Sequence, residues 1–85
     1  LALQKAGAFA IVLESVIPAA ARRLTAELNI PTIGIGCGEK TCDGEIAVIT
    51  DVIGSYPWFA PPFATQRANV AADITKAVKG YLESL

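Results

Sequence analysis

The sequence predicts an α/β fold built on parallel strands, and three observations support that class. An unbroken apolar run from Ala8 to Leu13 ends at Glu14, which is typical of a strand covered on both faces. A helical pattern and a second short apolar segment follow at βαβ spacing. Strand-like and helical segments continue to alternate after that, as they do in layered α/β proteins. Ligands bind outside the carboxyl ends of parallel strands, so Glu14 stands where we expect chemistry.

Composition and charge exclude several classes of protein. The 85 residues allow one small domain at most, and a content of 53% hydrophobic and 18% charged residues is that of a globular chain. The net charge of -1 argues against a nucleic-acid partner, because phosphate binding needs a basic excess. No apolar run approaches the roughly 18 residues of a membrane span. Two cysteines are too few for a disulfide framework and suit a reducing, cytoplasmic compartment.

The first third of the chain gives a helix end, a strand and a second helix. Residues 1–6 have the pattern of the last turns of a helix that stops at Gly7, so we expect a longer protein cut on its N-terminal side. The strand 8–14 follows. Pro18 suits the first turn of the next helix, and Pro31 prevents that helix from continuing. One apolar stripe runs along the helix: Ile17, Ala21, Leu24 and Leu28.

A glycine-rich loop separates the next two predicted strands. Residues 32–36 form the second strand, which should lie parallel to the first with a right-handed crossover. The loop opens with Gly36-Cys37-Gly38 and ends at the turn signal Asp43-Gly44. Residues 45–49 are expected to form a third strand.

The last part of the chain predicts a short helical turn, a loop and a long helix. The turn covers residues 50–54 and is expected to be capped by Thr50 or Asp51. Residues 55–63 are rich in proline and aromatic residues, which predicts an ordered loop pinned by aromatic packing. The final helix is expected from about Asn69 to Leu82. Its apolar face consists of Val70, Ile74, Ala77, Val78, Tyr81 and Leu82.

This order of elements fits the closing portion of a (β/α)8 TIM barrel. A complete barrel needs about 250 residues, so three parallel strands with their helices amount to roughly its last third. Three strands alone would leave raw sheet edges and an uncovered apolar face. We therefore expect residues 1–85 to be the C-terminal part of a single (β/α)8 barrel domain.

Three motifs together resemble a known family. Gly7 to Glu14 reads GAFAIVLE, Ile30 to Gly38 reads IPTIGIGCG, and Cys42 to Glu45 reads CDGE. In this order and spacing they resemble the C-terminal part of ketopantoate hydroxymethyltransferase (3-methyl-2-oxobutanoate hydroxymethyltransferase), and the resemblance covers essentially the whole chain. It implies a (β/α)8 barrel that transfers a hydroxymethyl group from 5,10-methylenetetrahydrofolate to 3-methyl-2-oxobutanoate. The product is 2-dehydropantoate, an intermediate on the way to pantothenate and coenzyme A.

The resemblance also implies roles for particular residues. The 2-oxo acid chelates Mg²⁺, which makes the neighbouring C3–H bond more acidic. The glutamate that ends the VLE strand is the base that removes the C3 proton, and it corresponds to Glu14. A desolvated strand end in an apolar barrel mouth would raise the pKa of such a carboxylate toward neutrality, as base catalysis requires. Gly36 and Gly38 border the folate side and are weaker substrate-binding candidates.

Several further properties of the family carry over as expectations. The metal ligands of the family lie earlier in the barrel, so we assign no metal ligand in residues 1–85 and expect these residues alone to be inactive. A homo-oligomer is also implied. Three positions depart from the family pattern: Ser15 stands where Cys is frequent, Cys37 where Ala is common, and Thr50 where His often occurs.

Two rival functions remain open. One is another Mg²⁺-dependent barrel enzyme acting on 2-oxo acids, of the phosphoenolpyruvate mutase and isocitrate lyase group. The other is a small non-catalytic α/β module of flavodoxin-like type, which would fold cooperatively by itself.

Each candidate residue also has a structural interpretation. Glu14 could be a solvated strand end, and Gly36 and Gly38 could serve a turn with close backbone approach. Cys37 and Cys42 are expected to be free thiols, because a zinc site needs more ligands at tighter spacing. Asp43 and Asp51 could help to shape the mouth of the barrel, or serve a turn and a helix start. Trp58, Phe59 and Phe63 could line a pocket or a subunit contact, with core packing as the expected role.

Overall fold

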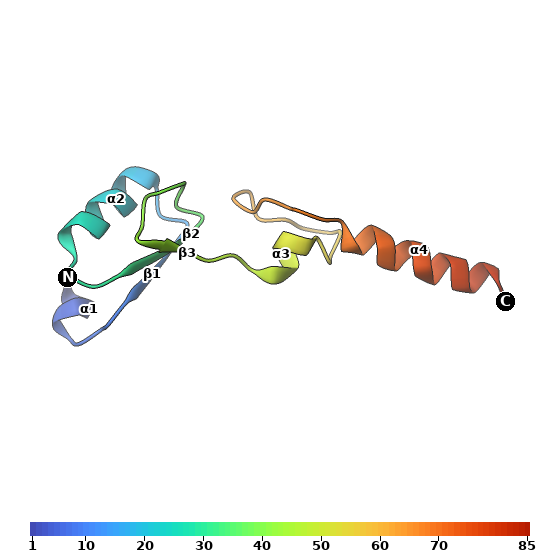
Figure 1. Cartoon of the computed structure of the whole chain (residues 1–85), viewed down its shortest axis with the longest axis horizontal. Helices are drawn as coiled ribbons and strands as arrows, with labels where there is room; N and C mark the ends of the chain where they lie inside the picture. The colour runs from blue at the N-terminus through green and yellow to red at the C-terminus, as the bar shows by residue number, and fades with distance from the viewer. The chain divides into compact units, whose positions relative to one another are not determined.

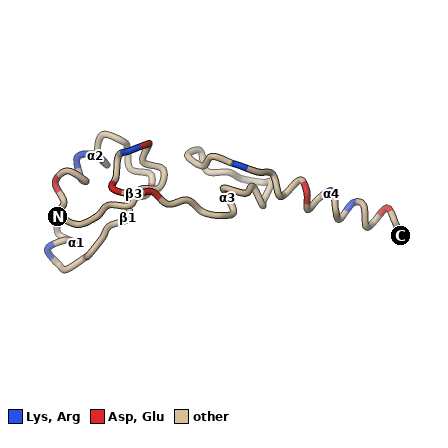
Figure 2. The backbone as a smooth tube through the Cα atoms, viewed as in Figure 1, with Lys and Arg blue, Asp and Glu red and all other residues tan.

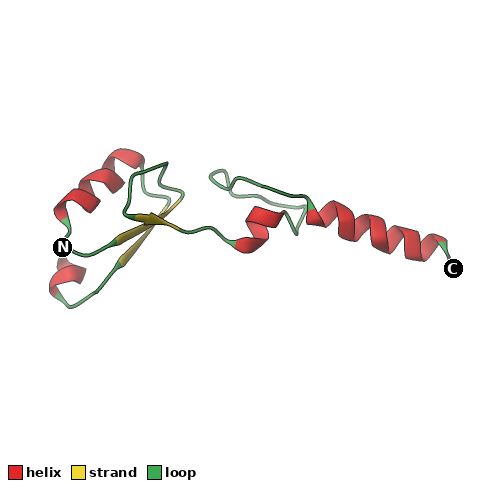
Figure 3. Ribbon diagram, in the orientation of Figure 1, coloured by secondary structure: helices red, strands yellow, loops and turns green.

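The structure is a computed structural model that describes all residues from Leu1 to Leu85. The chain divides into two compact units, a first unit of residues Leu1–Ile46 and a second unit of residues Ala47–Leu85. Figures 1 and 3 show the elements of both. In chain order they are α1 (Ala2–Lys5), β1 (Ile11–Glu14), α2 (Pro18–Glu27), β2 (Thr32–Ile35), β3 (Gly44–Glu45), α3 (Ile49–Ile53) and α4 (Val70–Glu83).

The first unit contains a three-stranded parallel sheet in the order β1-β2-β3. Strands β1 and β2 are in register from the pair Ile11 and Thr32 to the pair Glu14 and Ile35. Helix α2 connects these two strands, so they form the βαβ unit that the spacing predicts. The predicted α/β class with three parallel strands is therefore confirmed, and the closed barrel stays a prediction.

Helix α2 covers one face of this sheet (Figure 1). Pro18 lies in its first turn, as predicted, and Ala21 of the same helix is fully buried. The hydroxyl oxygens of Thr25 on α2 and Thr32 on β2 lie 2.8 Å apart. Ile17, a member of the predicted apolar stripe, precedes the helix as its N-cap and is 70% exposed.

The opposite face of the sheet is open. The side chains of successive strand residues point to opposite faces of the sheet. Thr32, Gly34 and the residues paired with them lie on the face covered by α2, so the other strand residues lie on the opposite face. The prediction that the first strand is covered on both faces is therefore wrong for this chain: Val12 is 56% exposed and Glu14 is exposed. The residues of the open face are Val12, Glu14, Ile33, Ile35 and Ile46.

The third strand is shorter than predicted. It contains Gly44 and Glu45 alone, and the last bond to β2 runs from the nitrogen of Ile46 to the carbonyl oxygen of Gly34. Ile49, predicted to end this strand, begins α3. The predicted caps are also wrong, because Thr50 and Asp51 lie inside α3 and its N-cap, Val48, makes no side-chain capping bond.

The second unit is organised around Gly54, which ends α3 in the left-handed conformation with φ 63°. The chain then loops out and returns past α3, where the nitrogen of Arg67 donates to the carbonyl oxygen of Val52. The nitrogen of Ala71 donates to Gly54 in the same way at 2.8 Å. These bonds join the start of α4 to the end of α3.

Helix α4 matches its prediction to within one residue at each end. Asn69 is the N-cap, and its side chain accepts a hydrogen bond from the nitrogen of Ala72 at 3.1 Å. Beyond Ala71 every residue of the helix is exposed, the predicted apolar face included. None of the helices in this chain combines the length and the apolar composition that a membrane crossing requires.

The aromatic loop is ordered by one stacked pair. The rings of Tyr56 and Trp58 lie 5.5 Å apart at an interplanar angle of 20°. The predicted core packing of Trp58, Phe59 and Phe63 is wrong here, because Trp58 is 80% exposed and Phe59 and Phe63 are exposed as well. Their neighbours in the loop are prolines and small residues, which supply no second layer over the rings.

Candidate active site

Glu14 lies at the carboxyl edge of the sheet, where the strand pattern predicts it. It is the last residue of β1 and is paired with Ile35, the last residue of β2. The nitrogen of Ser15 donates to the carbonyl oxygen of Ile35 at 2.8 Å, which holds the two strand ends together. After each of these two strands the backbone turns away through a residue in the left-handed conformation, Ser15 at φ 55° after β1 and Gly36 at φ 71° after β2. The strand ends therefore form a defined edge, with Glu14 on the open face.

The Glu14 carboxylate is exposed and lies apart from the one salt bridge of the chain. That salt bridge joins Arg23 and Glu27 on the surface of α2 at 2.9 Å, and it raises the pKa of Arg23 through the hydrogen bond and charge of Glu27. Figure 2 shows that acidic and basic residues are spread along the chain instead of gathering on one element. Glu14 therefore takes part in no salt bridge. Its catalytic role stays a prediction.

The two glycines of the candidate binding loop have structural roles at this edge. Gly36 turns the chain out of β2, and Gly38 has φ 87°. A Cβ on Gly38 would lie 3.0 Å from Cγ of Pro18, so the loop packs directly against the first turn of α2. The hydroxyl of Thr41 donates to the carbonyl oxygen of Gly38 at 3.2 Å and fixes the loop from the other side. Binding of substrate by Gly36 and Gly38 stays a prediction.

Cys37 supports the edge in a way that the sequence pattern did not indicate. Its side chain is 2% exposed, and Sγ lies 3.1 Å from the carbonyl oxygen of Leu13 and 3.7 Å from that of Ile35. The thiol therefore contacts the ends of β1 and β2 beside Glu14. The one available signal was its position, directly after the glycine that ends the second strand.

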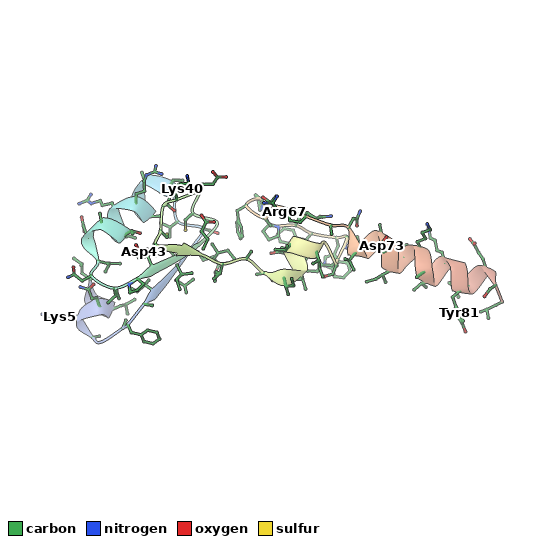
Figure 4. All side chains as sticks on the ribbon, viewed as in Figure 1. Lys5, Lys40, Asp43, Arg67, Asp73 and Tyr81 are labelled. Carbon is green, nitrogen blue, oxygen red and sulfur yellow. The ribbon has the colours of Figure 1, made fainter.

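Asp43 lies at the opposite edge of the sheet, before β3 (Figure 4). Its Oδ2 accepts from the nitrogen of Thr32 at 2.9 Å, and Thr32 begins β2. The interpretation of Asp43 as a turn residue therefore fits the structure, and Asp43 does not shape the carboxyl edge.

Asp51 belongs to the second unit and accepts a hydrogen bond from the hydroxyl of Tyr56. That bond raises the pKa of Tyr56, because losing the phenol proton would remove the donor and set a second negative charge beside Asp51. The hydroxyl of Thr50 acts in the opposite direction. The arrangement ties the aromatic loop to α3.

Two other features bear on ligand binding. A groove of about 640 Å³ lies in the second unit along α4, between Asn69, Lys76, Lys79 and the loop residue Pro57. No group of three or more His, Cys, Asp or Glu side chains in the chain is arranged to hold a metal ion.

Comparison with known proteins agrees with the motifs. A sequence model of the family described as ketopantoate hydroxymethyltransferase matches residues 1–85. Proteins named 3-methyl-2-oxobutanoate hydroxymethyltransferase are similar over nearly all of this chain. The one from Syntrophus aciditrophicus is 46% identical over 83 residues, which are 98% of this chain and 30% of that protein. The one from Pelobacter propionicus is 48% identical over 85 residues, which are 100% of this chain and 31% of that protein.

A third relative gives the same result. The 3-methyl-2-oxobutanoate hydroxymethyltransferase of Trichodesmium erythraeum is 52% identical over 81 residues, covering 95% of this chain and 30% of that protein. The chain thus spans a little under one third of the length of the curated relatives it matches. The family match extends from the first residue to the last, and it includes the β1 edge with Glu14 and the loop that follows β2. The chain belongs to the ketopantoate hydroxymethyltransferase family.

Proposed function

We propose that this chain supplies the general base of a hydroxymethyltransferase that acts on 3-methyl-2-oxobutanoate. The one-carbon donor is 5,10-methylenetetrahydrofolate and the product is 2-dehydropantoate, which leads to pantothenate and coenzyme A. Membership of the family and the names of the relatives support this reaction. The observation that carries the residue assignment is the position of Glu14 at the carboxyl end of a parallel strand, exposed on the open face.

In this proposal Glu14 removes the proton from C3 of the 2-oxo acid. The resulting carbon nucleophile forms a bond to the one-carbon unit of the folate. A water molecule supplies the hydroxyl oxygen, both C–N bonds of the methylene carbon break, and tetrahydrofolate leaves with the two protons of that water. The C3 proton then passes from the Glu14 carboxyl group to the new alkoxide, which restores the base. The carboxylate fits this task because no salt bridge occupies it and the bond from Ser15 to Ile35 fixes the strand end beneath it. We assign the folate side of the substrates to the neighbouring strand end, where Gly36 and Gly38 lie.

Mg²⁺ would increase the acidity of the C3–H bond when bound. Because the side chains of this chain form no cluster of three ligands, we derive no step through the metal and assign its ligands to residues outside Leu1–Leu85. The proposal therefore includes a longer protein, in which these residues close a (β/α)8 barrel. The open face of the sheet supports that view, since Val12, Ile33 and Ile35 would line a barrel interior. We also propose that this longer protein is a cytoplasmic homo-oligomer.

Deuterium exchange at C3 tests the role of Glu14. The full-length enzyme containing this segment is incubated with 3-methyl-2-oxobutanoate and Mg²⁺ in deuterated buffer without folate, and exchange is followed by proton NMR. A general base contributes about 10² to 10⁴ in rate, so Glu14→Gln should slow exchange by that factor. Glu45→Gln is the matched control, because Glu45 is exposed, lies on β3 and is not on the open face.

The outcomes separate the alternatives. If Glu14→Gln exchanges the C3 proton at the parental rate, Glu14 is not the general base. A parent that consumes 2-oxo acids without any dependence on methylenetetrahydrofolate would favour the mutase and lyase group. The non-catalytic module predicts that residues 1–85 unfold cooperatively by themselves in urea, whereas the barrel proposal predicts a broad transition or aggregation and no exchange activity.

A further inference from the structure

The two cysteines of the chain both lie beside Gly34. A Cβ built on Gly34 would lie 2.9 Å from Sγ of Cys42 and 3.6 Å from Cβ of Cys37. Gly34 is buried, and because it is a glycine it places no side chain beside the two cysteines. Both thiols are free in the structure.

We propose that Cys37 and Cys42 form a reversible disulfide, which makes the loop after β2 a redox-sensitive modification site. The formation of a disulfide requires Cβ atoms about 3.5–4.5 Å apart. The Cβ atoms of Cys42 and Cys37 lie 3.4 and 3.6 Å from the same point, the position of a Cβ built on Gly34, which limits their separation to the sum of these two distances. Because Gly34 has no side chain at that point, a shift of the loop can bring the two cysteines closer together. That loop contains Gly36 and Gly38, whose backbone freedom permits such a shift.

The exposure of the two thiols sets the order of the steps. Cys42 is partly exposed and Cys37 is 2% exposed, so an oxidant in solution reaches Cys42 first. With glutathione disulfide as the oxidant, the Cys42 thiolate attacks one of its sulfurs and displaces one glutathione. Cys37 then loses its proton and attacks the Cys42 sulfur, displacing the second glutathione. One glutathione disulfide is thereby reduced to two glutathione molecules, and two protein thiols become one disulfide.

The oxidised state changes the carboxyl edge of the sheet. In the reduced chain the Cys37 thiol donates to the carbonyl oxygen of Leu13, the residue before Glu14. Formation of the disulfide removes the proton of that bond. The modification therefore acts on the end of β1, although it needs no part of the proposed reaction and can be measured without substrate.

The test is a thiol–disulfide titration of the full chain. The protein is equilibrated in glutathione buffers of graded reduced-to-oxidised ratio, quenched with acid, alkylated and examined by mass spectrometry. The same titration is performed in concentrated urea. We expect one two-electron transition to an internal Cys37–Cys42 disulfide. Its equilibrium constant should be at least tenfold larger in the folded than in the unfolded chain, which corresponds to a difference of about 30 mV in reduction potential.

Two substitutions make the test specific to the geometry. Gly34→Ala places a Cβ against the Cys42 sulfur and should lower the equilibrium constant several-fold. Gly44→Ala is the matched control, because a Cβ there meets nothing within 4 Å, and it should leave the constant unchanged. In Cys37→Ser, Cys42 should instead accumulate as a mixed disulfide with glutathione.

Three results would overturn the proposal. They are equal constants in folded and unfolded chains, separate mixed disulfides on Cys37 and Cys42 in the folded parent, or the same constant in Gly34→Ala and Gly44→Ala. Exchange at the parental rate in Glu14→Gln, which would overturn the proposed function, would not affect any of them, so this inference and the proposed function fail independently.

Discussion

Asp43 and Thr32 are joined by a reciprocal pair of hydrogen bonds across the amino edge of the sheet. Oδ2 of Asp43 accepts from the nitrogen of Thr32 at 2.9 Å, and the nitrogen of Asp43 donates to the hydroxyl of Thr32 at 3.2 Å. Thr32 is fully buried, and its hydroxyl also lies 2.8 Å from that of Thr25 on α2. One carboxylate therefore connects the start of β2, the turn before β3 and, through Thr32, the covering helix.

Removal of this carboxylate should destabilise the first unit. Asp43→Ala leaves the buried nitrogen of Thr32 without its acceptor, which costs about 1–3 kcal/mol of the free energy of unfolding. Urea unfolding of variant and parent measures the difference. Asp43→Asn keeps an oxygen acceptor and should retain most of the stability.

Glu39→Ala is the matched control for Asp43. Glu39 is an exposed acid in the same loop, so its removal should change the free energy of unfolding by less than about 0.5 kcal/mol. Equal effects of Asp43→Ala and Glu39→Ala would contradict the structural role of the pair.

Gly54→Ala should disrupt the second unit. Gly54 is left-handed and buried, and a Cβ there would overlap the carbonyl oxygen of Ala68 and the side chain of Gln66. The conformation alone costs about 1–2 kcal/mol for a residue with a Cβ. Hydrogen exchange of the Ala71 amide, which donates to Gly54, should become faster.

A second glycine substitution should change the stability in the opposite direction. Gly80 lies inside α4, where a Cβ meets nothing within 4 Å, so Gly80→Ala should stabilise the helix by about 0.5–1 kcal/mol. If both substitutions moved the exchange rates in the same direction, the steric account of Gly54 would be wrong.

The cap of α4 should be measurable by itself. Asn69→Ala removes the acceptor for the nitrogen of Ala72 and should cost about 1 kcal/mol of helix stability. Circular dichroism and amide exchange in the first turn report the loss. Asn69→Asp preserves the acceptor and adds a charge that favours the helix N-terminus, so a comparable loss in that variant would contradict a capping role.

The hydrogen bond from Tyr56 to Asp51 makes the second unit sensitive to alkaline pH. The pKa of Tyr56 is raised above its ordinary value of 10.0, chiefly by that bond. A raised folded-state pKa means that the stabilisation is fully present below the unfolded-state pKa and is lost as pH rises through the folded-state pKa. Ultraviolet titration of tyrosinate should therefore show one delayed phase.

Two variants assign that phase. Asp51→Asn should bring the delayed phase back toward the ordinary tyrosine range. Tyr56→Phe should abolish the delayed phase, because Tyr81 is then the one tyrosine left in the chain. A delayed phase that survives in Tyr56→Phe would show that another group is responsible.

Local patterns in the sequence predicted those elements whose signals lie within a few residues. Pro18 begins α2, and Asn69 caps α4. The spacing from the run ending at Glu14 to the second strand predicted a parallel pair, and the pair is in register up to Glu14 and Ile35. These features depend on backbone sterics, capping and hydrophobic period, which neighbouring residues determine.

Tertiary contacts decided the rest, because they join residues that are far apart in the chain. The apolar residues 46–49 have the composition of a strand, but β3 ends at Glu45 and Ile49 begins a helix instead. No periodicity indicated that the Cys37 thiol would contact Leu13, or that Gly34 would separate two cysteines. The sequence by itself determined the order of elements and the place of Glu14 at a strand end. The structure alone decided which face of the sheet is covered, since burial depends on what packs against a residue and not on the residue itself.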